Sequence, residues 1–458
     1  MNTTYKKQLE QALIHMAGIT IYRNILNDEI VKKYSELIHL LNGYSAAKSN
    51  ANFSRLLNCY HEILSMLIYR YSEDHHMTGD LWKMHIIHLL LSDENPFSLA
   101  CEKAKDFNLP EGLLKIVKMD LRHIQFLFNL DGDILQTIIK SKVPVDTLPA
   151  WVLRAYNKFP PASYAENEKS LAGFDTVHVL YCSENWELET DTLKTYYYQF
   201  GCGIFSQYKA FRWNQNDACG FLTGIDKPDP IRLSQLISYE RERSIVIKNT
   251  MQFIHGLPCN NVLLYGDRGT GKSATVKAIL NEYADYRLRL IEVSKYHLIS
   301  LPQIMETLQK RGLRFILFID DLSFESDESS YRELKSILEG GIEVKPENVV
   351  IYATSNRRHL IKEYFSERSV TDEVSSRDTM QEKLSLSDRF GITVTFSLPD
   401  KETYLQIVEG LAKKRGLDID TAVLRAEALK WEMRYNGRSP RTASQFINYL
   451  EGELKPEK

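Results

Sequence analysis

The sequence predicts an α/β domain with a parallel sheet and a C-terminal helical lid, preceded by a mostly α-helical N-terminal region with a small β-containing segment. Three observations lead to this prediction. Between residues 260 and 396, short apolar segments alternate with helical patterns, which is typical of βαβ units. From residue 401 onward, three further helical patterns form a small bundle. Residues 5–158 repeat apolar side chains at helical spacing.

The predicted sheet contains five core strands. They cover residues 260–265, 288–293, 315–319, 349–353 and 392–396. Parallel strands that are buried on both faces are near-continuous apolar runs, and the segment over 315–319 fits that description. The lid helices are expected at about 402–414, 420–435 and 440–453.

Changes in composition divide the chain into four parts. Proline-containing stretches over residues 142–162 end the helical region, and the next segment is rich in β-branched and aromatic residues with interrupting glycines. We expect a mostly helical N-terminal domain over 1–160, a small mixed or β segment with a linker over 161–225, an α/β domain over 226–400, and a helical lid over 401–458.

Composition narrows the functional class. The chain has 458 residues, a formal net charge of −3, 43% hydrophobic residues and six scattered cysteines without a C-x-x-C pair. This charge gives no overall electrostatic basis for nucleic-acid binding. The chain starts without an apolar signal segment, and no run of about 18 apolar residues could cross a membrane. We therefore expect a cytoplasmic protein with free thiols and no membrane contact.

The most informative motif is a glycine-rich loop between the first core strand and a helix. Its residues are Gly266, Asp267, Arg268, Gly269, Thr270, Gly271, Lys272, Ser273 and Ala274. The pattern G-x-x-x-x-G-K-S in this context is a P-loop, whose backbone N–H groups and helix N-terminus bind phosphate. The lysine can reach the β- and γ-phosphates, and the serine hydroxyl can ligate Mg²⁺. The motif predicts binding of a nucleoside triphosphate, with ATP and Mg²⁺ as the expected ligands.

A second acidic motif lies about 50 residues after the P-loop. The apolar strand over 315–319 ends in Asp320 and Asp321, at the edge of a parallel sheet where active-site residues lie. We expect Asp320 to hold Mg²⁺ together with Ser273, directly or through water. Asp321 is a candidate for polarising the attacking water, and Glu325 is the alternative because its side chain reaches further.

The order of these motifs resembles the AAA+ superfamily. The resemblance includes the P-loop, the acidic strand end, the segments over 352–360 and 384–391, and the helical lid. Within that superfamily, these blocks resemble a bacterial family of predicted AAA+ ATPases classed as a domain of unknown function. The resemblance covers about residues 230–455.

The resemblance implies roles for five further residues. Asn356 would be a polar sensor that positions the hydrolytic water, and Arg389 would be an arginine finger offered to a neighbouring subunit. Arg441, just inside the last lid helix, would report the nucleotide state to the lid. Ile237 and Tyr239 would line the adenine pocket.

Two departures from the family pattern affect these expectations. Ser238 stands in the pocket-forming turn where many relatives carry glycine, which puts the backbone of this turn and the base selectivity in question. Residues 293–300 lack the aromatic–hydrophobic–glycine loop of polypeptide-threading rings, so we interpret Tyr296 as a packing residue at a helix start and disfavour threading.

These observations lead to the hypothesis of an oligomeric ATPase of the remodelling or loader type, with Mg-ATP at subunit interfaces. The homo-oligomer, ring- or hexamer-like, follows from a finger that acts in trans. The alternative is a nucleotide-gated scaffold or switch with little turnover that acts on a protein or DNA partner. A small-molecule kinase is disfavoured. We expect residues 1–225 to select a protein client, and at this net charge we do not favour nucleic acid.

Overall fold

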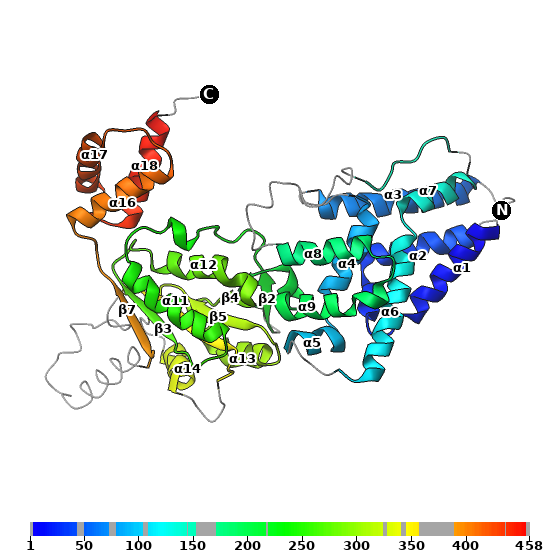
Figure 1. Ribbon diagram of the computed structural model, residues 1–458, viewed down its shortest axis with the longest axis horizontal. Coiled ribbons are helices and arrows are strands. Elements are labelled where there is room, and N and C mark those ends of the chain that lie inside the picture. Colours follow the sequence, from blue (N-terminus) through cyan, green and yellow to red (C-terminus); the bar gives the residue numbers. More distant parts are fainter. Residues whose placement is uncertain are drawn as a thin grey trace. The chain divides into compact units, whose positions relative to one another are not determined.

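The fold is described from a computed structural model, in two compact units, Met1–Gln207 and Tyr208–Lys458. The residues that the structure describes are 3–43, 50–72, 79–103, 109–143, 145–152, 171–216, 219–323, 328–339, 345–356, 389–435 and 437–454. Each unit is considered by itself (Figure 1).

Helices form all but one isolated β-bridge (Asp80 with Val152) of the regular secondary structure in the described residues of the N-terminal unit. Its helices are α1 (Thr3–Gly18), η1 (Arg23–Asn27), α2 (Glu29–Asn42), α3 (Asn50–Tyr71), α4 (Leu81–Ser92), α5 (Pro96–Lys103), α6 (Glu111–Asn129), α7 (Gly132–Lys140), α8 (Leu171–Cys182), η3 (Trp186–Glu189), α9 (Thr190–Phe200) and α10 (Ile204–Gln207). Aspartates cap several of them: Asp28 accepts from the N–H groups of Ile30 and Val31, and Asp80 accepts from Lys83 N–H. These caps satisfy N–H groups that have no partner within the helix.

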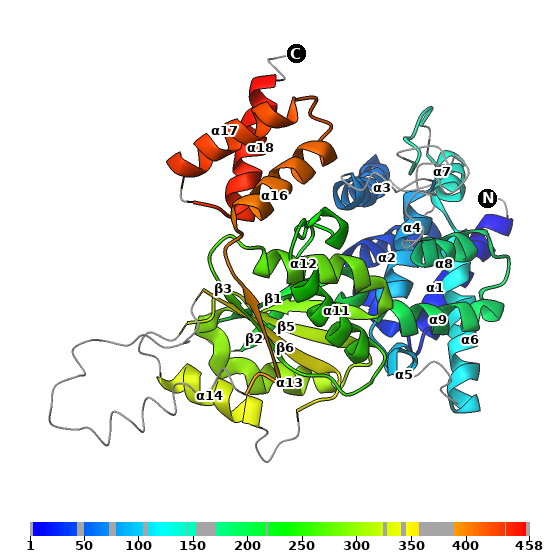
Figure 2. The ribbon, with the colours of Figure 1, turned by 60° about the vertical axis from the view of Figure 1, so that its left-hand side comes forward.

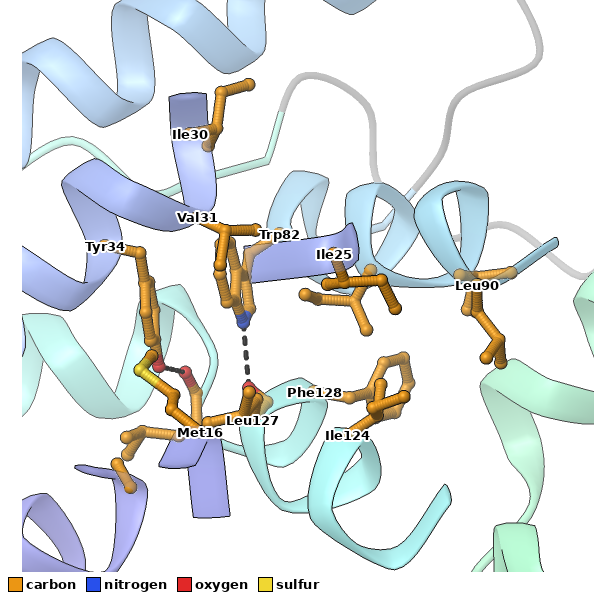
Figure 3. Packing of buried hydrophobic residues seen from close by; sticks show 14 of the residues in the cluster. Met16, Ile25, Ile30, Val31, Tyr34, Trp82, Leu90, Ile124, Leu127 and Phe128 are labelled. Carbon is orange, nitrogen blue, oxygen red and sulfur yellow. Dashed lines mark hydrogen bonds between the residues drawn. The ribbon is translucent and has the colours of Figure 1, made fainter. Parts of the chain in front are cut away.

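Aromatic side chains organise the core of this unit (Figure 3). Trp82 stacks on Tyr34 with ring centroids 3.7 Å apart. The indole N–H of Trp82 donates to Leu127 O at 2.8 Å, and the Tyr34 hydroxyl donates to Leu130 O at 2.6 Å. Both polar tips are thus hydrogen-bonded inside an apolar cluster, which allows such large rings to be fully buried.

The segment expected to contain β-structure before residue 208 is helical instead. Residues 171–182 form α8 and residues 190–200 form α9, although both are rich in β-branched and aromatic side chains. Buried residues recur at helical spacing in each, with Leu193 and Tyr197 four residues apart in α9. Packing into the core therefore outweighs intrinsic strand preference here. The boundary between the units accordingly falls at 207/208.

The C-terminal unit contains a seven-stranded sheet in the order β2-β1-β4-β5-β6-β3-β7. The strands are β1 (Ala210–Gln215), β2 (Gly220–Gly224), β3 (Val262–Gly266), β4 (Leu288–Glu292), β5 (Arg314–Ile319), β6 (Val349–Ser355) and β7 (Ile392–Phe396). All neighbouring pairs are parallel except β1–β2. The five predicted core strands are present, and β1 and β2 extend the same sheet rather than forming a separate segment.

Helices surround this sheet (Figure 2). They are η4 (Leu233–Gln235), α11 (Glu240–Ile254), α12 (Lys272–Tyr283), η5 (Ala284–Tyr286), η6 (Lys295–Ser300), α13 (Leu301–Gln309) and α14 (Glu328–Glu339). Residues of α11 and α12 share one apolar cluster with alternate residues of the strands, such as Val262 and Phe318. The intervening residues Leu263 and Leu317 are also buried, so the sheet is covered on both faces.

Three helices form the lid: α16 (Lys401–Lys414), α17 (Thr421–Arg434) and α18 (Pro440–Leu454). They pack around their own apolar cluster, which includes Tyr404, Leu424 and Phe446. The predicted α/β fold, with a mostly parallel sheet, a glycine-rich loop between its first core strand and a helix, a C-terminal helical lid and a mostly helical N-terminal region, is confirmed. No helix in the described ranges combines the length and apolarity needed to cross a lipid bilayer.

Candidate nucleotide site

The phosphate-binding loop connects β3 to α12 through three glycines in backbone conformations that other residues avoid. Gly266, Gly269 and Gly271 have φ of 136°, 78° and 95°. A Cβ on Gly266 would lie 2.1 Å from the carbonyl oxygen of Phe396, so only glycine fits beside the end of β7. The loop therefore follows a path that exposes backbone N–H groups at the N-terminus of α12, where an anion can bind.

Lys272 begins α12 and turns its ammonium back toward the loop. Its Nζ donates to Gly266 O at 2.8 Å, to Asp267 O at 2.6 Å and to Asn356 Oδ1 at 3.1 Å. The residue is only 6% exposed, and this burial lowers the pKa of the ammonium from its ordinary value. The positive charge is thus held at the floor of the site, between the loop and the end of β6.

Hydroxyl groups from two different elements converge on Asp320. Ser273 Oγ donates to Asp320 Oδ1 at 2.6 Å, and Thr354 Oγ1 donates to the same oxygen at 2.5 Å. Ser273 lies in the first turn of α12 and Thr354 near the end of β6. The structure therefore brings together the serine and the aspartate that the sequence predicted as a metal-binding pair.

Asp321 adopts a left-handed backbone conformation, with φ of 52°. Its N–H donates to Thr354 Oγ1 at 3.0 Å, and its carboxylate accepts from Asn356 Nδ2 at 2.6 Å. Because Asn356 Oδ1 also accepts from Lys272, this amide connects the ammonium to the second carboxylate. Glu325, the alternative to Asp321, lies outside the described residues.

A cavity of about 540 Å³ opens above this floor. Its lining comprises Ile231, Gln235, Leu236, Ile237, Tyr239, Arg243, Arg268, Gly269, Thr270, Gly271, Lys272, Ser273, Ala274, Thr275, Asp320, Asp321, Thr354, Asn356, Phe396, Ile407, Leu411, Pro440, Arg441 and Ser444. Polar and charged groups gather at the floor, whereas the segment before α11 and the lid contribute apolar side chains. This division suits a ligand with an anionic end and a flat apolar end.

The turn before α11 forms the apolar side of the cavity. Ser238 and Tyr239 have φ of 67° and 61°, so the serine adopts the left-handed conformation that glycine would favour at this position. The Tyr239 hydroxyl donates to Ser397 O at 2.6 Å, and burial raises the pKa of Tyr239 to about 12. Ile237 packs against the apolar cluster of the lid. The substitution at Ser238 is therefore accommodated in a strained turn.

The lid is bonded to the loop at two places. The N–H of Arg441 donates to Gly269 O at 3.1 Å, at the start of α18, where Ser439 Oγ accepts from Thr442 N–H. The carboxylate of Asp267 accepts from the N–H of Leu398 at 3.1 Å, in the hinge between β7 and α16. Arg441 thus lines the cavity, as its predicted role requires, and contacts the loop through its backbone.

Two predicted residues lie elsewhere. Arg389 precedes β7, whose other end lies beside Gly266, and it does not occur among the described residues that line the cavity. Tyr296 is 75% exposed, with Lys295 Nζ 5.4 Å from its ring centroid. The interpretation of Tyr296 as a packing residue is therefore wrong, because the short helix η6 turns this ring toward solvent.

Sequence reasoning missed three contributions to this site. Thr354 binds both acidic residues, and Ile407 and Leu411 supply the wall of the cavity from α16. Thr354 lies two residues before Asn356, so the available signal was the change from apolar to polar residues at the end of this strand. The lid residues carry no comparable signal, since only the folded lid brings them over the loop.

Residues 206–454 match the family model described as "Protein of unknown function (DUF815)". This match covers more than half of the 458 residues, so the chain belongs to that family, and the resemblance stated above is confirmed. No curated protein matches the chain.

Among solved structures, the chain is similar to the RuvB Holliday junction branch migration motor of Thermotoga maritima, with 18% identity over 49% of this chain and 65% of that chain, and a TM-score of 0.35. Two point mutants of the same RuvB are 17–18% identical to this chain. Each match covers 49% of this chain and 66% of the mutant, and has a TM-score of 0.35. The matched region thus spans less than two thirds of the length of these structures.

Proposed function

We propose that this family member is an oligomeric ATPase that binds Mg-ATP and hydrolyses it to ADP and phosphate. One observation supports this most strongly: Lys272, Asp320, Asp321 and Asn356 meet on the floor of a single cavity beside a glycine loop. A loop that only connected a strand to a helix would not require this set of charged and polar groups.

The residues present fit the phosphates of a nucleotide. The three glycines with positive φ place no side chain at their positions in the loop, and the collision that a Cβ would make at Gly266 shows that this path depends on glycine. Lys272 Nζ is held by neutral carbonyl oxygens and an amide oxygen, partners that a phosphate oxygen can replace with a stronger, charge-assisted bond. The apolar wall with Ile237 and Tyr239 would take the base.

The donor set also fits magnesium. Ser273 Oγ and the Asp320 carboxylate are hard oxygen donors 2.6 Å apart, and Mg²⁺ binds through one or two carboxylates together with phosphate oxygens. When bound, the ion would neutralise charge on the β- and γ-phosphate oxygens. Ser273 and Asp320 would hold it, while Thr354 keeps Asp320 oriented.

For hydrolysis, Asp321 and Asn356 would position the attacking water. Their side chains are hydrogen-bonded at 2.6 Å, so both lie at the same point of the sheet edge. Glu325 remains the alternative water-polarising residue. Positioning and electrostatic stabilisation account for most catalysis of phosphoryl transfer, which suits a rigid strand end as the platform.

The oligomer in this proposal rests on Arg389. Arg389 precedes β7 and is not among the described residues that line the cavity at the other end of this strand, so we place it in the site of a neighbouring subunit. An arginine supplied in trans can contribute about 10³–10⁵ in rate. Such a composite site suits a remodelling or loader-type ATPase. Arg441, which lines the cavity from the lid, would make the position of the lid depend on the bound nucleotide.

We further propose that residues 1–225 select a protein client in the cytoplasm. Nucleic acid is not favoured as the partner, because the net charge is −3.

The decisive experiment measures ATP hydrolysis against protein concentration, with assembly followed by light scattering, for wild type, Lys272→Ala and Arg389→Ala. We expect specific activity to rise with concentration, Lys272→Ala to lose nucleotide binding, and Arg389→Ala to bind ATP but hydrolyse it poorly. Concentration-independent turnover that is indifferent to Arg389 would refute the composite site. Binding without turnover in wild type would favour the nucleotide-gated switch, and a phosphorylated acceptor would identify a kinase.

A further inference from the structure

One threonine, Thr354, connects the two acidic residues that follow β5. It lies in β6, where it pairs with Leu264 of β3, while Ala353 pairs with Ile319 of β5. Its side chain is 2% exposed, so its hydroxyl must find its partners within the protein. Both partners belong to the acidic pair.

The directions of these two hydrogen bonds follow from the groups involved. A hydroxyl has one hydrogen to donate and lone pairs to accept. The N–H of Asp321 can only donate, so Thr354 Oγ1 accepts that bond at 3.0 Å. The single hydroxyl hydrogen is therefore directed to Asp320 Oδ1, at 2.5 Å, in a bond that the negative charge strengthens.

We propose that Thr354 is the positioning residue of this site, orienting the metal-side carboxylate of Asp320 and holding the backbone of Asp321 at the same time. This inference rests on the proposed nucleotide function and deepens it, since it assigns a role to a residue whose hydroxyl is bonded to the two acidic residues of the site. Thr354 acts through Asp320 and Asp321.

Thr354 differs in one respect from Ser273, the other hydroxyl on Asp320 Oδ1. Ser273 belongs to the nucleotide-binding loop and helix, whereas Thr354 belongs to a central strand buried on both faces. Thr354 therefore fixes the orientation of Asp320 relative to the sheet, independently of what Ser273 binds.

The same hydroxyl supports an unfavourable backbone conformation. Asp321 has φ of 52°, a conformation that residues other than glycine adopt only when neighbouring groups hold them there. The bond from Asp321 N–H to Thr354 Oγ1 is followed by one from Leu322 N–H to Thr354 O at 2.7 Å. One residue of β6 thus binds two successive amides of the turn through its side chain and its carbonyl.

The test compares Thr354→Val, which keeps the shape but loses the hydroxyl, with Thr354→Ser, which keeps the hydroxyl. The measurements are the affinity for a fluorescent ATP analogue with and without Mg²⁺, and amide hydrogen exchange of residues 320–323 in nucleotide-free protein. For Thr354→Val we expect nearly unchanged affinity without Mg²⁺, a Mg²⁺-dependent gain in affinity reduced about 10–100-fold, and faster exchange at Asp321. Thr354→Ser should show the wild-type affinity without Mg²⁺, the wild-type gain in affinity with Mg²⁺ and the wild-type exchange rate at Asp321.

The matched control is Ser355→Ala. Ser355 is the next residue of the same strand, is 1% exposed and donates its single hydroxyl hydrogen to Leu322 O at 2.9 Å, so this hydrogen is not donated to either carboxylate. This variant should keep the Mg²⁺ dependence of wild type. If Thr354→Val does not fold, Thr354→Ala replaces it in the comparison with Thr354→Ser.

Failure of this inference is distinguishable from failure of the proposed function. If Thr354→Val keeps the Mg²⁺ dependence and the amide exchange of wild type, the positioning role is refuted, whatever the turnover. If wild type binds nucleotide without hydrolysing it, hydrolysis is refuted while the Mg²⁺ dependence still decides the role of Thr354. If wild type binds no nucleotide, the exchange at Asp321 alone decides it.

Discussion

Replacing Asp267 tests whether the phosphate-binding loop holds the hinge of the lid. The Asp267 carboxylate accepts from the N–H of Leu398 at 3.1 Å, and the N–H of Asp267 donates to Phe396 O at 3.1 Å. The second bond joins main-chain atoms and persists after substitution. Asp267→Ala therefore removes the bond between the loop and the hinge together with a charge near Lys272, and Asp267→Asn removes the charge but keeps an uncharged acceptor.

The expected magnitude follows from the type and exposure of this bond. Hydrogen bonds to charged groups contribute about 1.5–3 kcal/mol net. Both Asp267 and Leu398 are exposed, so competition from water reduces the contribution, and we expect about 1 kcal/mol. A loss of this size increases the population of the open hinge roughly fivefold, because about 1.4 kcal/mol corresponds to a factor of ten.

Hydrogen exchange of residues 397–400 in nucleotide-free protein measures this population. Exchange should accelerate about fivefold in Asp267→Ala and by less in Asp267→Asn. Asp400→Ala is the control, since Asp400 accepts from Thr403 N–H at 2.8 Å and caps α16 without touching the loop. It should accelerate exchange at the start of α16 alone. If Asp267→Ala exchanges at the wild-type rate, the bond between Asp267 and Leu398 does not hold the hinge closed.

Three further predictions concern other parts of the chain. Gly266→Ala should abolish binding of an ATP analogue and lower the melting temperature, because the added Cβ would lie 2.1 Å from Phe396 O. Gly271→Ala should lower the melting temperature less, because its Cβ meets no atom within 4 Å, although its φ is 95°. Ser238→Gly should raise the free energy of unfolding by about 1 kcal/mol in urea denaturation, since it relieves a left-handed serine at φ 67°; unchanged or lower stability would contradict this. Burial raises the pKa of Asp80 to about 6, against about 3.9 in an unfolded chain. The protonated carboxyl therefore contributes fully to stability below about pH 4, and this contribution is lost as the pH rises through 6. Asp80 is 8% exposed, and the shift of its pKa between the unfolded and folded chain changes the free energy of unfolding by up to about 3 kcal/mol over this pH range. Melting curves of wild type and Asp80→Asn between pH 4 and 8 should diverge over this window, and parallel curves would contradict the prediction.

The sheet and the phosphate loop could be predicted because their signals are local. A buried parallel strand requires a continuous apolar run, and a loop around phosphate requires glycine, lysine and serine at fixed spacing. Residues 262–266 begin with such a run, and residues 392–396 alternate apolar residues with threonine, so both segments were recognisable as strands although they pair across more than a hundred residues of sequence. Asp320 could be predicted as a site residue for a similar reason, because it directly follows the apolar run over 315–319.

The remaining features depend on contacts that are distant in sequence. Whether residues 171–182 form a helix or a strand is decided by the core that they enter. β1 joins the sheet by pairing with β4, and nothing in residues 210–215 identifies that partner. Thr354 and Asp267 likewise gain their roles from side-chain contacts across adjoining strands and the hinge, and the exposure of Tyr296 depends on how η6 turns after β4.

The hairpin of β1 and β2 determines where the chain can be divided. A fragment beginning at residue 226, at the boundary that composition suggests, would lack both strands. β4 would then become a bare edge, with unpaired main-chain groups along Leu288–Glu292 able to recruit the strands of other molecules. A fragment beginning at Tyr208 keeps this protection and starts within two residues of the family match. The smallest fragment that keeps the β4 edge of this sheet paired should therefore begin at Tyr208.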